Sequence, residues 1–410
     1  MTRRRATAFG AGLATALAAA MALAPPDTHA ERPAPGGADC VPVGRWLDVA
    51  GGELRPVDKV MAGLARRSVV LLGETHTNPD HHRWQLQVIA ALHGRNPNLV
   101  LAFESFPRAV QPALDAWTRG ELDGDAFLAR TRWNEVWRYD PALYMPLFQF
   151  ARLNLIPMVA MNVERDLIGR VRDEGWDAVP EAAREGVTTP RPAEPGYVDM
   201  LRDILSQHRP GDDGGDKKPA MADDDPGLQR FVQAQTTWDA AMAQKVAQVA
   251  KGPGAPLVVG IVGQGHLQYR YGIPHQLAGL GIPDAAVLLP WDRHDDCAQL
   301  RTAGGRAVAD TLFGVVAPQA TVAAPKPRLG VMIAQGKAGV RVAGVVDGSV
   351  AAAAGLAKDD EILTAAGYPT PGLSDLVDIV KRMAPGTWLP LTVRRGATDM
   401  EIIAKFPKRD

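Results

Sequence analysis

Short apolar runs alternate with helical patterns over roughly the first three quarters of the chain. The runs are rich in Val, Ile, Leu and Ala, and they predict strands at Ser68–Leu72, Asn98–Glu104, Ile156–Asn162, Leu257–Gly263 and Ala285–Leu289. Between them, apolar residues that could cover a sheet predict helices at His82–Leu92, Leu143–Asn154 and Gln229–Ala250. All-apolar strands that alternate with helices predict an α/β domain whose mostly parallel sheet is covered by helices on both faces.

The pattern changes in two places. Residues 206–226 are dense in Asp, Gly and Pro and carry almost no apolar side chain, which predicts a mobile surface insertion in a domain that spans 31–305. An Ala, Val and Pro-rich stretch begins at Val315, and we assign 306–326 to an interdomain linker. Beyond it, predicted strands at Arg341–Val346, Leu389–Arg394 and Met400–Phe406 and a helix at Leu373–Met383 indicate a small β-rich domain over 327–408.

The first thirty residues have the features of an export signal. A basic head at Arg3–Arg5 precedes the uncharged, Ala-rich run Ala6–Leu23, and small residues end at Ala30. We therefore expect cleavage after Ala30 and a soluble periplasmic or secreted protein. The formal net charge of -1 gives no electrostatic reason to expect a nucleic acid as partner.

The chain has two cysteines, Cys40 and Cys297, which bracket the predicted first domain. In an oxidising compartment such a pair usually forms a disulfide. The alternative is a lipid-modified Cys40, but Gly37, Ala38 and Asp39 before it provide no aliphatic lipobox. The disulfide is the prediction we prefer.

Polar residues follow the predicted strands where those strands end. Glu74 and His76 follow the first strand, Glu104 and Asn162 end the second and third, and His266 follows the fourth. Because the carboxyl ends of parallel strands meet at one edge of a sheet, we expect these side chains to converge. Two imidazoles with one or two carboxylates fit a divalent-metal site, with His76, Glu104 and His266 as ligands. The same residues could equally act as general acids and bases. His81 and His82 are consecutive at a helix start, so we expect at least one of them on the surface.

Residues 64–295 resemble the haem-binding uptake group of the Tiki superfamily, specifically the ChaN-like proteins. The resemblance is carried by Gly73-Glu74-Thr75-His76, Phe103-Glu104-Ser105, Tyr139-x4-Tyr144-x-Pro146, Ile156–Asn162, Gln235-x2-Trp238-Asp239-x2-Met242-Ala243 and Gly263-x-Gly265-His266. It implies haem binding through tyrosine, a link to iron uptake and a homodimer that sandwiches two haems. Other branches of the superfamily resemble hydrolases, which implies a metal-dependent peptidase or esterase as the alternative, with His76, Glu104, His266 and Glu74 as catalytic residues.

For haem, a tyrosine or histidine must reach the iron within an apolar surround. Tyr269 and Tyr271 lie just beyond His266, and two residues apart on a strand they would face the same side. Tyr144 is a further candidate.

The C-terminal domain resembles a PDZ domain. The resemblance is carried by Arg328-Leu329-Gly330-Val331, Val345–Ala351, Ala354-Gly355-Leu356 and Lys358–Leu363. It implies that amides near Leu329, Gly330 and Val331 bind the C-terminus of a partner peptide, which would add to the domain as a strand. The alternative is a folded appendage that binds no partner.

Overall fold

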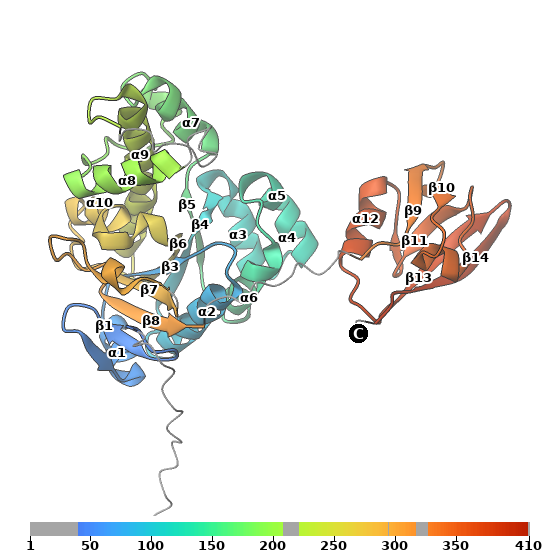
Figure 1. Cartoon of the computed structure of the whole chain (residues 1–410), viewed down its shortest axis with the longest axis horizontal. Coiled ribbons are helices and arrows are strands. Elements are labelled where there is room, and N and C mark those ends of the chain that lie inside the picture. The colour runs from blue at the N-terminus through green and yellow to red at the C-terminus, as the bar shows by residue number, and fades with distance from the viewer. Residues whose placement is uncertain (1–39, 208–220, 294, 317–326, 409–410) are drawn as a thin grey trace, which may run out of the picture. The chain divides into compact units, whose positions relative to one another are not determined.

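The computed structural model describes residues 40–207, 221–293, 295–316 and 327–408. The chain divides into two compact units, the first ending at Val316 and the second beginning at Ala317 (Figure 1). The predicted signal sequence at 1–30 lies outside the described residues.

The first unit is built on a mixed sheet with the strand order β2-β1-β8-β7-β3-β6-β4-β5. Strands β8, β7, β3, β6, β4 and β5 are parallel, whereas β1 runs antiparallel to both of its neighbours. The strands are β1 Trp46–Asp48, β2 Glu53–Arg55, β3 Val69–Glu74, β4 Leu99–Pro107, β5 Met158–Asn162, β6 Leu257–Gly263, β7 Ala286–Asp292 and β8 Thr311–Val315. All five strands predicted for this unit are present, so the predicted parallel sheet is confirmed.

Alternate residues of each central strand enter two separate cores. Val70 and Leu72 of β3 pack with one core, and Val69 and Leu71 pack with the other. Helices α1 to α6 cover the first face, and α9 and α10 cover the second. Helices α7 and α8 pack against α9. Because both faces are covered, these strands are apolar throughout rather than alternating.

The helices of this unit connect successive strands. They are α1 Val57–Leu64, α2 Pro79–His93, α3 Gln111–Thr118, α4 Gly124–Arg130, α5 Trp133–Val136, α6 Pro141–Leu153, α7 Arg165–Glu174, α8 Pro195–Gln207, α9 Pro226–Ala250 and α10 Ile273–Gly279. Short 3-10 helices lie at η1 Arg108–Val110, η2 Glu181–Ala183, η3 Gln264–His266, η4 Gln268–Arg270 and η5 Cys297–Leu300.

The structure places the boundaries of the predicted linker and of the predicted surface insertion differently. The linker assigned to 306–326 begins too early, because β8 pairs with β7 and β1 and Leu312 is fully buried. The predicted insertion at 206–226 is narrower than expected, because α8 continues to Gln207 and α9 begins at Pro226. Within it, residues 208–220 lie outside the described part of the chain.

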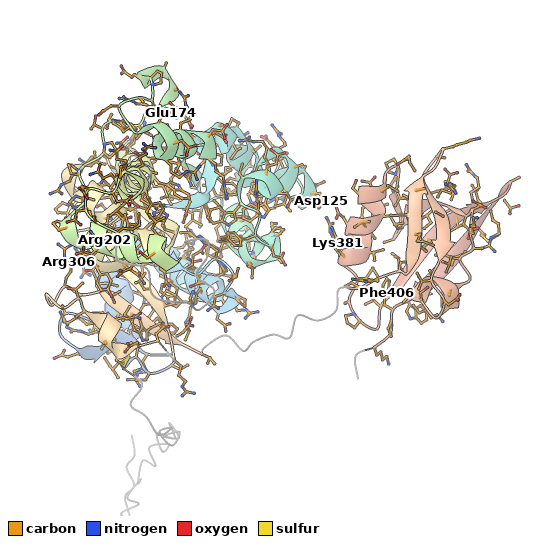
Figure 2. All side chains as sticks on the ribbon, turned by 45° about the horizontal axis from the view of Figure 1, so that its top comes forward. Asp125, Glu174, Arg202, Arg306, Lys381 and Phe406 are labelled. Carbon is orange, nitrogen blue, oxygen red and sulfur yellow. A yellow bond between two sulfur atoms is a disulfide. The ribbon has the colours of Figure 1, made fainter. Side chains whose placement is uncertain are left out.

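The second unit is an antiparallel sheet with the order β14-β13-β11-β10-β9, and β12 pairs with β11. Its elements are β9 Val331–Gln335, β10 Val340–Val345, α11 Val350–Ala354, β11 Glu361–Ala365, β12 Tyr368–Pro369, α12 Leu373–Lys381, β13 Trp388–Arg395 and β14 Thr398–Lys405. Phe406 is buried in the core of this unit, and both it and Lys381, the last residue of α12, are labelled in Figure 2. Strand β9 is at the edge of the sheet, next to α12.

The predicted disulfide between Cys40 and Cys297 is present. It joins the residues just before β1 to η5, so it links the two ends of the first unit. None of the helices formed by the described residues is both long enough and apolar enough to cross a membrane.

Candidate functional site

The polar residues predicted to converge do lie at the carboxyl edge of the parallel strands. Glu74 at the end of β3 is opposite Gly263 at the end of β6, and Glu104 lies near the end of the adjacent β4. A Cβ added to Gly263 would lie 2.8 Å from His76 Cε1, 3.2 Å from His76 Nε2 and 3.4 Å from Glu104 Oε2. His76 and Glu104 therefore approach each other across a space that only glycine leaves open.

Glu74 is buried and lies at the centre of a group of polar side chains formed with His76, His82 and Tyr144. Its Oε1 accepts hydrogen bonds from Tyr144 Oη at 2.5 Å and from His76 Nδ1 at 2.8 Å. His82 Nδ1 lies 3.0 Å from Glu74 Oε2, and His82 Nε2 donates to the His76 carbonyl at 3.1 Å. Burial alone would raise the pKa of Glu74, but the two imidazoles lower it to about 2. Contact with Glu74 raises the pKa of His76 and of His82 despite their burial.

His266 belongs to a second group of the same kind. Its Nδ1 donates to Asp239 Oδ1 at 2.7 Å, and Tyr197 Oη donates to Asp239 Oδ2 at 2.7 Å. On the other side of the ring, His266 Nε2 lies 3.5 Å from Glu104 Oε1. Although burial disfavours the charged imidazole, Asp239 and Glu104 raise the pKa of His266 to about 9. Three buried carboxylates, Glu74, Glu104 and Asp239, thus face three imidazoles with raised pKa values.

The remaining residues of the edge hold this arrangement in place. Glu104 Oε2 accepts from the Gly263 amide at 2.6 Å. Asn162 donates to the Glu104 carbonyl at 2.8 Å and accepts from Trp238 Nε1 at 2.7 Å, and the Trp238 ring meets His266 edge-on. Asn162 therefore has a positioning role for its neighbours.

Sequence reasoning missed Asp239 and His82. Asp239 belongs to the Gln235-x2-Trp238-Asp239 part of the ChaN-like resemblance. A fully buried aspartate inside helix α9 requires a partner, but the sequence does not identify that partner. The expectation that His81 or His82 is exposed is wrong, since both are buried. His81 Nδ1 accepts from the Thr75 amide at 2.9 Å, and its Nε2 lies 3.4 Å from Asp292.

The three predicted haem-binding tyrosines do not share one surface. Tyr144 is fully buried against Glu74. Tyr269 and Tyr271 lie in and just after η4 rather than on the expected strand, and Tyr269 has a left-handed φ of 54°. The Tyr269 hydroxyl donates to the Gln299 carbonyl at 2.9 Å. Tyr271 is buried between Tyr197 and the guanidinium of Arg306, which is labelled in Figure 2.

The predicted metal ligands His76, Glu104 and His266 lie together, but each imidazole already has a carboxylate partner at Nδ1. Among the described residues, no group of three or more His, Cys, Asp or Glu side chains is arranged to hold a metal ion. The divalent-metal site stays a prediction.

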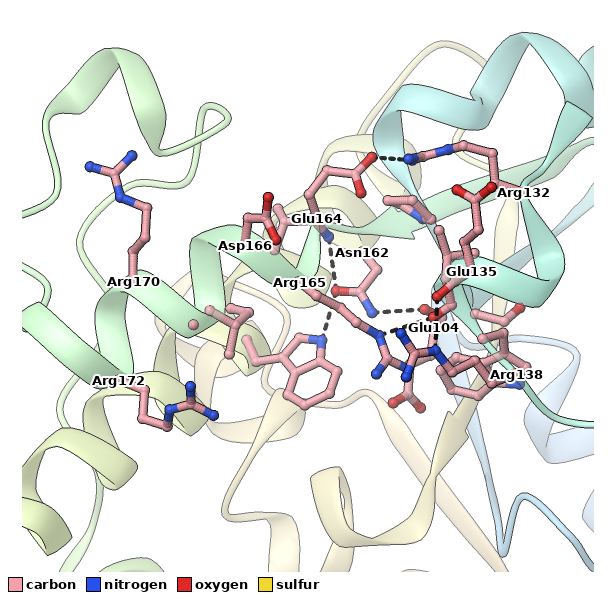
Figure 3. Close-up of a pocket in the computed structure, with 18 of the residues that line it drawn as sticks. Glu104, Arg132, Glu135, Arg138, Asn162, Glu164, Arg165, Asp166, Arg170 and Arg172 are labelled. Carbon is pink, nitrogen blue, oxygen red and sulfur yellow. Dashed lines mark hydrogen bonds and ion pairs between the residues drawn. The ribbon is translucent and has the colours of Figure 1, made fainter.

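A pocket of about 780 Å³ opens beside Glu104, and we call it the Glu104 pocket (Figure 3). Its walls come from the ends of β4 and β5, from the region of α5 and from α7, and they include Asn162, Trp137 and Trp238. Trp137 also packs edge-on against the His76 ring, with ring centres 4.7 Å apart. Glu104 and Asn162 thus line the pocket while the imidazoles lie behind its walls, and the size of the pocket is typical of small-molecule sites.

In the second unit, Gly330 has a left-handed φ of 82°, and a Cβ there would lie 2.2 Å from Ser349 Cβ. Leu329 is buried, whereas Val331 begins the edge strand β9 and is partly exposed. The predicted peptide-binding residues thus form a tight loop that leads into an unpaired strand edge.

Two family models match the chain. Residues 60–277 match the model described as haem-binding uptake, Tiki superfamily, ChaN, and residues 327–405 match the PDZ domain model.

A curated relative is the protein RETICULATA-RELATED 5, chloroplastic, of Arabidopsis thaliana. It is 27% identical over 268 residues, which cover 62% of this chain and 35% of the relative. The chain thus spans about a third of the length of that relative.

Two solved structures are similar to parts of the chain. ChaN of Campylobacter jejuni, described by its cofacial haem binding, is 18% identical with a TM-score of 0.48, covering 65% of this chain and 95% of that one. The HtrA-type protease AlgW with a decapeptide is 26% identical with a TM-score of 0.19, covering 20% of this chain and 29% of that one.

Proposed function

Because the chain belongs to the ChaN family of haem-binding uptake proteins in the Tiki superfamily and carries a C-terminal PDZ domain, we propose that its first unit binds haem. The match to the family model over residues 60–277 is the observation that carries this proposal. The Glu104 pocket supports it, because the pocket is concave and has the aromatic rings of Trp137 and Trp238 in its walls.

His76 is the residue of this site that would hold haem iron, and it lies behind the pocket wall, packed against Trp137. Its side chain is 25% exposed, and its ring lies between Trp137 and Tyr139. Glu74 accepts a hydrogen bond from Nδ1 and so orients the ring, as carboxylates behind metal-binding histidines do, and Nε2 would then be the nitrogen that holds the iron. The Tyr144 hydroxyl donates to Glu74 and the Tyr269 hydroxyl donates to the Gln299 carbonyl, so each of these two candidates would have to give up a hydrogen bond to hold iron.

A haemin titration tests both points. We expect the purified chain to give a saturable Soret band with a defined stoichiometry, and His76→Ala to weaken it about tenfold or more, as loss of a metal-site contact does. Tyr269→Phe and Tyr271→Phe are the matched comparison, and a loss confined to them would move the ligand assignment from histidine to tyrosine. Absence of a saturable band in the wild type would contradict haem binding.

We also propose that the protein is exported, acts in iron uptake and forms a homodimer when loaded with haem. The basic head and Ala-rich run before Ala30 support export, and the Cys40–Cys297 disulfide is compatible with an oxidising compartment. Intact mass after periplasmic fractionation tests cleavage after Ala30. Retention of Met1 on the fractionated protein would contradict it. Light scattering with and without haemin tests the dimer.

A hydrolase is the second candidate. It is favoured by the pair of oriented imidazoles, because His76 and His266 each have Nδ1 held by a buried carboxylate, as general acids and bases do. Glu104 lies between them and could hold a water molecule or a divalent metal for the same reaction.

A panel of peptides and esters tests this candidate. We expect His266→Gln to reduce any turnover by 10²–10⁴-fold, the range for loss of a general acid or base. No turnover by the wild type would exclude the panel's substrates.

A further inference from the structure

Two arginines of the Glu104 pocket are fixed in place without a carboxylate partner. Arg138 Nε donates to the Glu135 carbonyl at 3.2 Å, and Arg165 Nε donates to the Val136 carbonyl at 3.0 Å. Neither guanidinium forms an ion pair within the described part of the chain. Each therefore keeps its terminal Nη groups for a ligand.

These two guanidinium groups are close to each other, because they are anchored to the carbonyls of consecutive residues. Figure 3 shows both side chains at the Glu104 end of the pocket, away from Arg170 and Arg172. Two cations held this close repel each other, and an anion bound between them removes that repulsion.

The other charged side chains that line the pocket are three arginines and five carboxylates, and several of them are paired with one another. Arg132 forms an ion pair with Glu164, and Arg172 lies 3.0 Å from Asp173. Glu135 and Asp166 also line the pocket and, like Arg138 and Arg165, are exposed, so solvent screens the long-range field of all four side chains. The attraction for an anion is therefore local to Arg138 and Arg165 rather than a property of the whole pocket.

The backbone around α5 is strained where it presents these side chains. Arg132 and Arg138, which flank α5, have left-handed φ values of 53° and 68°. Such conformations are unfavourable for residues with a Cβ and persist where the fold requires them, often at binding sites.

Ser105 supplies an independent sign of a ligand. It is only 4% exposed and lines the Glu104 pocket, yet its Oγ has no hydrogen-bond partner among the described residues. A buried hydroxyl without a partner is unfavourable, and a ligand oxygen would accept its hydrogen bond.

We propose that the Glu104 pocket binds carboxylate groups, with Arg138 and Arg165 as the cations and Ser105 as a further donor. Planar guanidinium groups pair with carboxylates through two parallel hydrogen bonds. A porphyrin combines two carboxylates with a flat apolar ring, which matches guanidinium groups next to Trp137 and Trp238. In its choice of ligand, this inference rests on the proposed haem binding.

The test compares ligands with and without free carboxylates. Haemin and haemin dimethyl ester are titrated into the full chain, into Arg138→Gln and Arg165→Gln, and into Arg95→Gln. The last is the matched control, because Arg95 also donates to a backbone carbonyl but lies outside the pocket. We expect each pocket variant to lose about tenfold or more in haemin affinity. The wild-type chain should bind the ester more weakly than haemin. The affinity for the ester should be the same in all four proteins.

Iron-free protoporphyrin IX, followed by its fluorescence, separates this inference from the haem proposal. If haemin binds but neither esterification nor the pocket variants change its affinity, the inference is overturned and haem binding stands. If haemin gives no saturable binding but protoporphyrin binds in an Arg138-dependent and Arg165-dependent manner, haem binding fails and the carboxylate site stands. If neither porphyrin binds, both proposals are overturned.

Discussion

At the scale of single residues, the site consists of buried charges that compensate one another. Glu74 and Asp239 are each almost inaccessible to water, and each is neutralised by an imidazole within 3.0 Å. Removing one member of such a pair leaves an uncompensated buried charge, which is strongly destabilising. The residues that orient the site therefore also contribute to the stability of the first unit.

We expect the free energy of unfolding to be largest between about pH 4.5 and 6.5. The pKa of His266 is raised to about 9 in the folded chain from 6.5, so its contribution is complete below 6.5 and is lost as the pH rises through 9. The pKa of Glu74 is lowered to about 2 from 4.5, so its contribution is complete above 4.5 and is lost as the pH falls through 2. Each contribution is on the order of 3 kcal/mol, since a tenfold change in proton affinity corresponds to about 1.4 kcal/mol.

Urea unfolding at a series of pH values measures this dependence. His266→Gln should reduce the loss of stability at high pH, leaving the part that comes from the raised pKa values of His76 and His82, and should leave the loss at low pH. Stability that increases steadily from pH 6.5 to 9 in the wild type would contradict the expected protonation of His266.

Gly263→Ala should disturb the site without altering the sheet. The added methyl group would lie 2.8 Å from His76 Cε1, so His76 must move away from its position beside Glu104. We expect a loss of about 1–3 kcal/mol in unfolding free energy and a changed nuclear magnetic resonance signal for His76. Gly265→Ala is the control, because a Cβ at Gly265 meets no atom within 4 Å. Equal effects of the two substitutions would contradict the close packing at Gly263.

Part of the site could be predicted at this scale. Apolar strands end at or near Glu74, Glu104 and Asn162. Parallel strands bring such positions to one edge of the sheet independently of how the strands are connected. Asp239 could not be assigned, because it lies in the middle of a helix and its partners come from α8 and η3. The common orientation considered for Tyr269 and Tyr271 assumed a strand, and the pair lies in and after η4 instead, because two residues cannot reveal the left-handed turn at Tyr269.

At the scale of elements, the long apolar strands could be predicted and the short edge strands could not. The strands predicted at the centre of the first unit are continuous and buried, as in β3 and β6. Strand β2 has only three residues, all exposed, and β8 is followed closely by an Ala and Pro-rich stretch. Strands β1 and β8 are defined by their pairing with each other across more than half of the chain, and this information is absent from their local pattern. Among the described strands, β2 pairs only with its neighbour β1.

The edge strand β9 and its loop should determine peptide binding by the second unit. Gly330→Ala places a Cβ 2.2 Å from Ser349 Cβ, so the loop before β9 must open. Gly348→Ala is a matched control, because Gly348 also has a left-handed φ, of 70°, but its Cβ would meet no atom within 4 Å. Backbone strain should cost each substitution about 1 kcal/mol of unfolding free energy, and Gly330→Ala should cost more because of its contact with Ser349.

Only Gly330→Ala should also abolish binding of a C-terminal peptide, measured by fluorescence anisotropy with the full chain. Undiminished binding by this variant would show that the loop does not bind the carboxylate. The absence of any peptide ligand for the wild type would favour a folded appendage.

At the scale of the molecule, the two units should unfold as separate transitions, because each has its own core. The disulfide lies entirely in the first unit, and its cysteines are 257 positions apart in sequence. Cys40→Ser with Cys297→Ser should therefore destabilise only the first transition, by roughly 3–5 kcal/mol. Differential scanning calorimetry measures both transitions, and reduction of the wild type should reproduce the effect. A shift of the second transition instead would contradict the assignment of the disulfide to one unit.

The place of β1 in the sheet has a consequence for biosynthesis. β1 is the earliest strand of the first unit to leave the ribosome, yet β8, with which it pairs, is the last. The segment around Cys40 must stay unpaired while some 260 residues follow it, and only then can the edge of the sheet close and Cys40 meet Cys297. The N-terminal strand is thus among the last to be incorporated, and a truncated or stalled chain exposes the open edge of β7 to other chains.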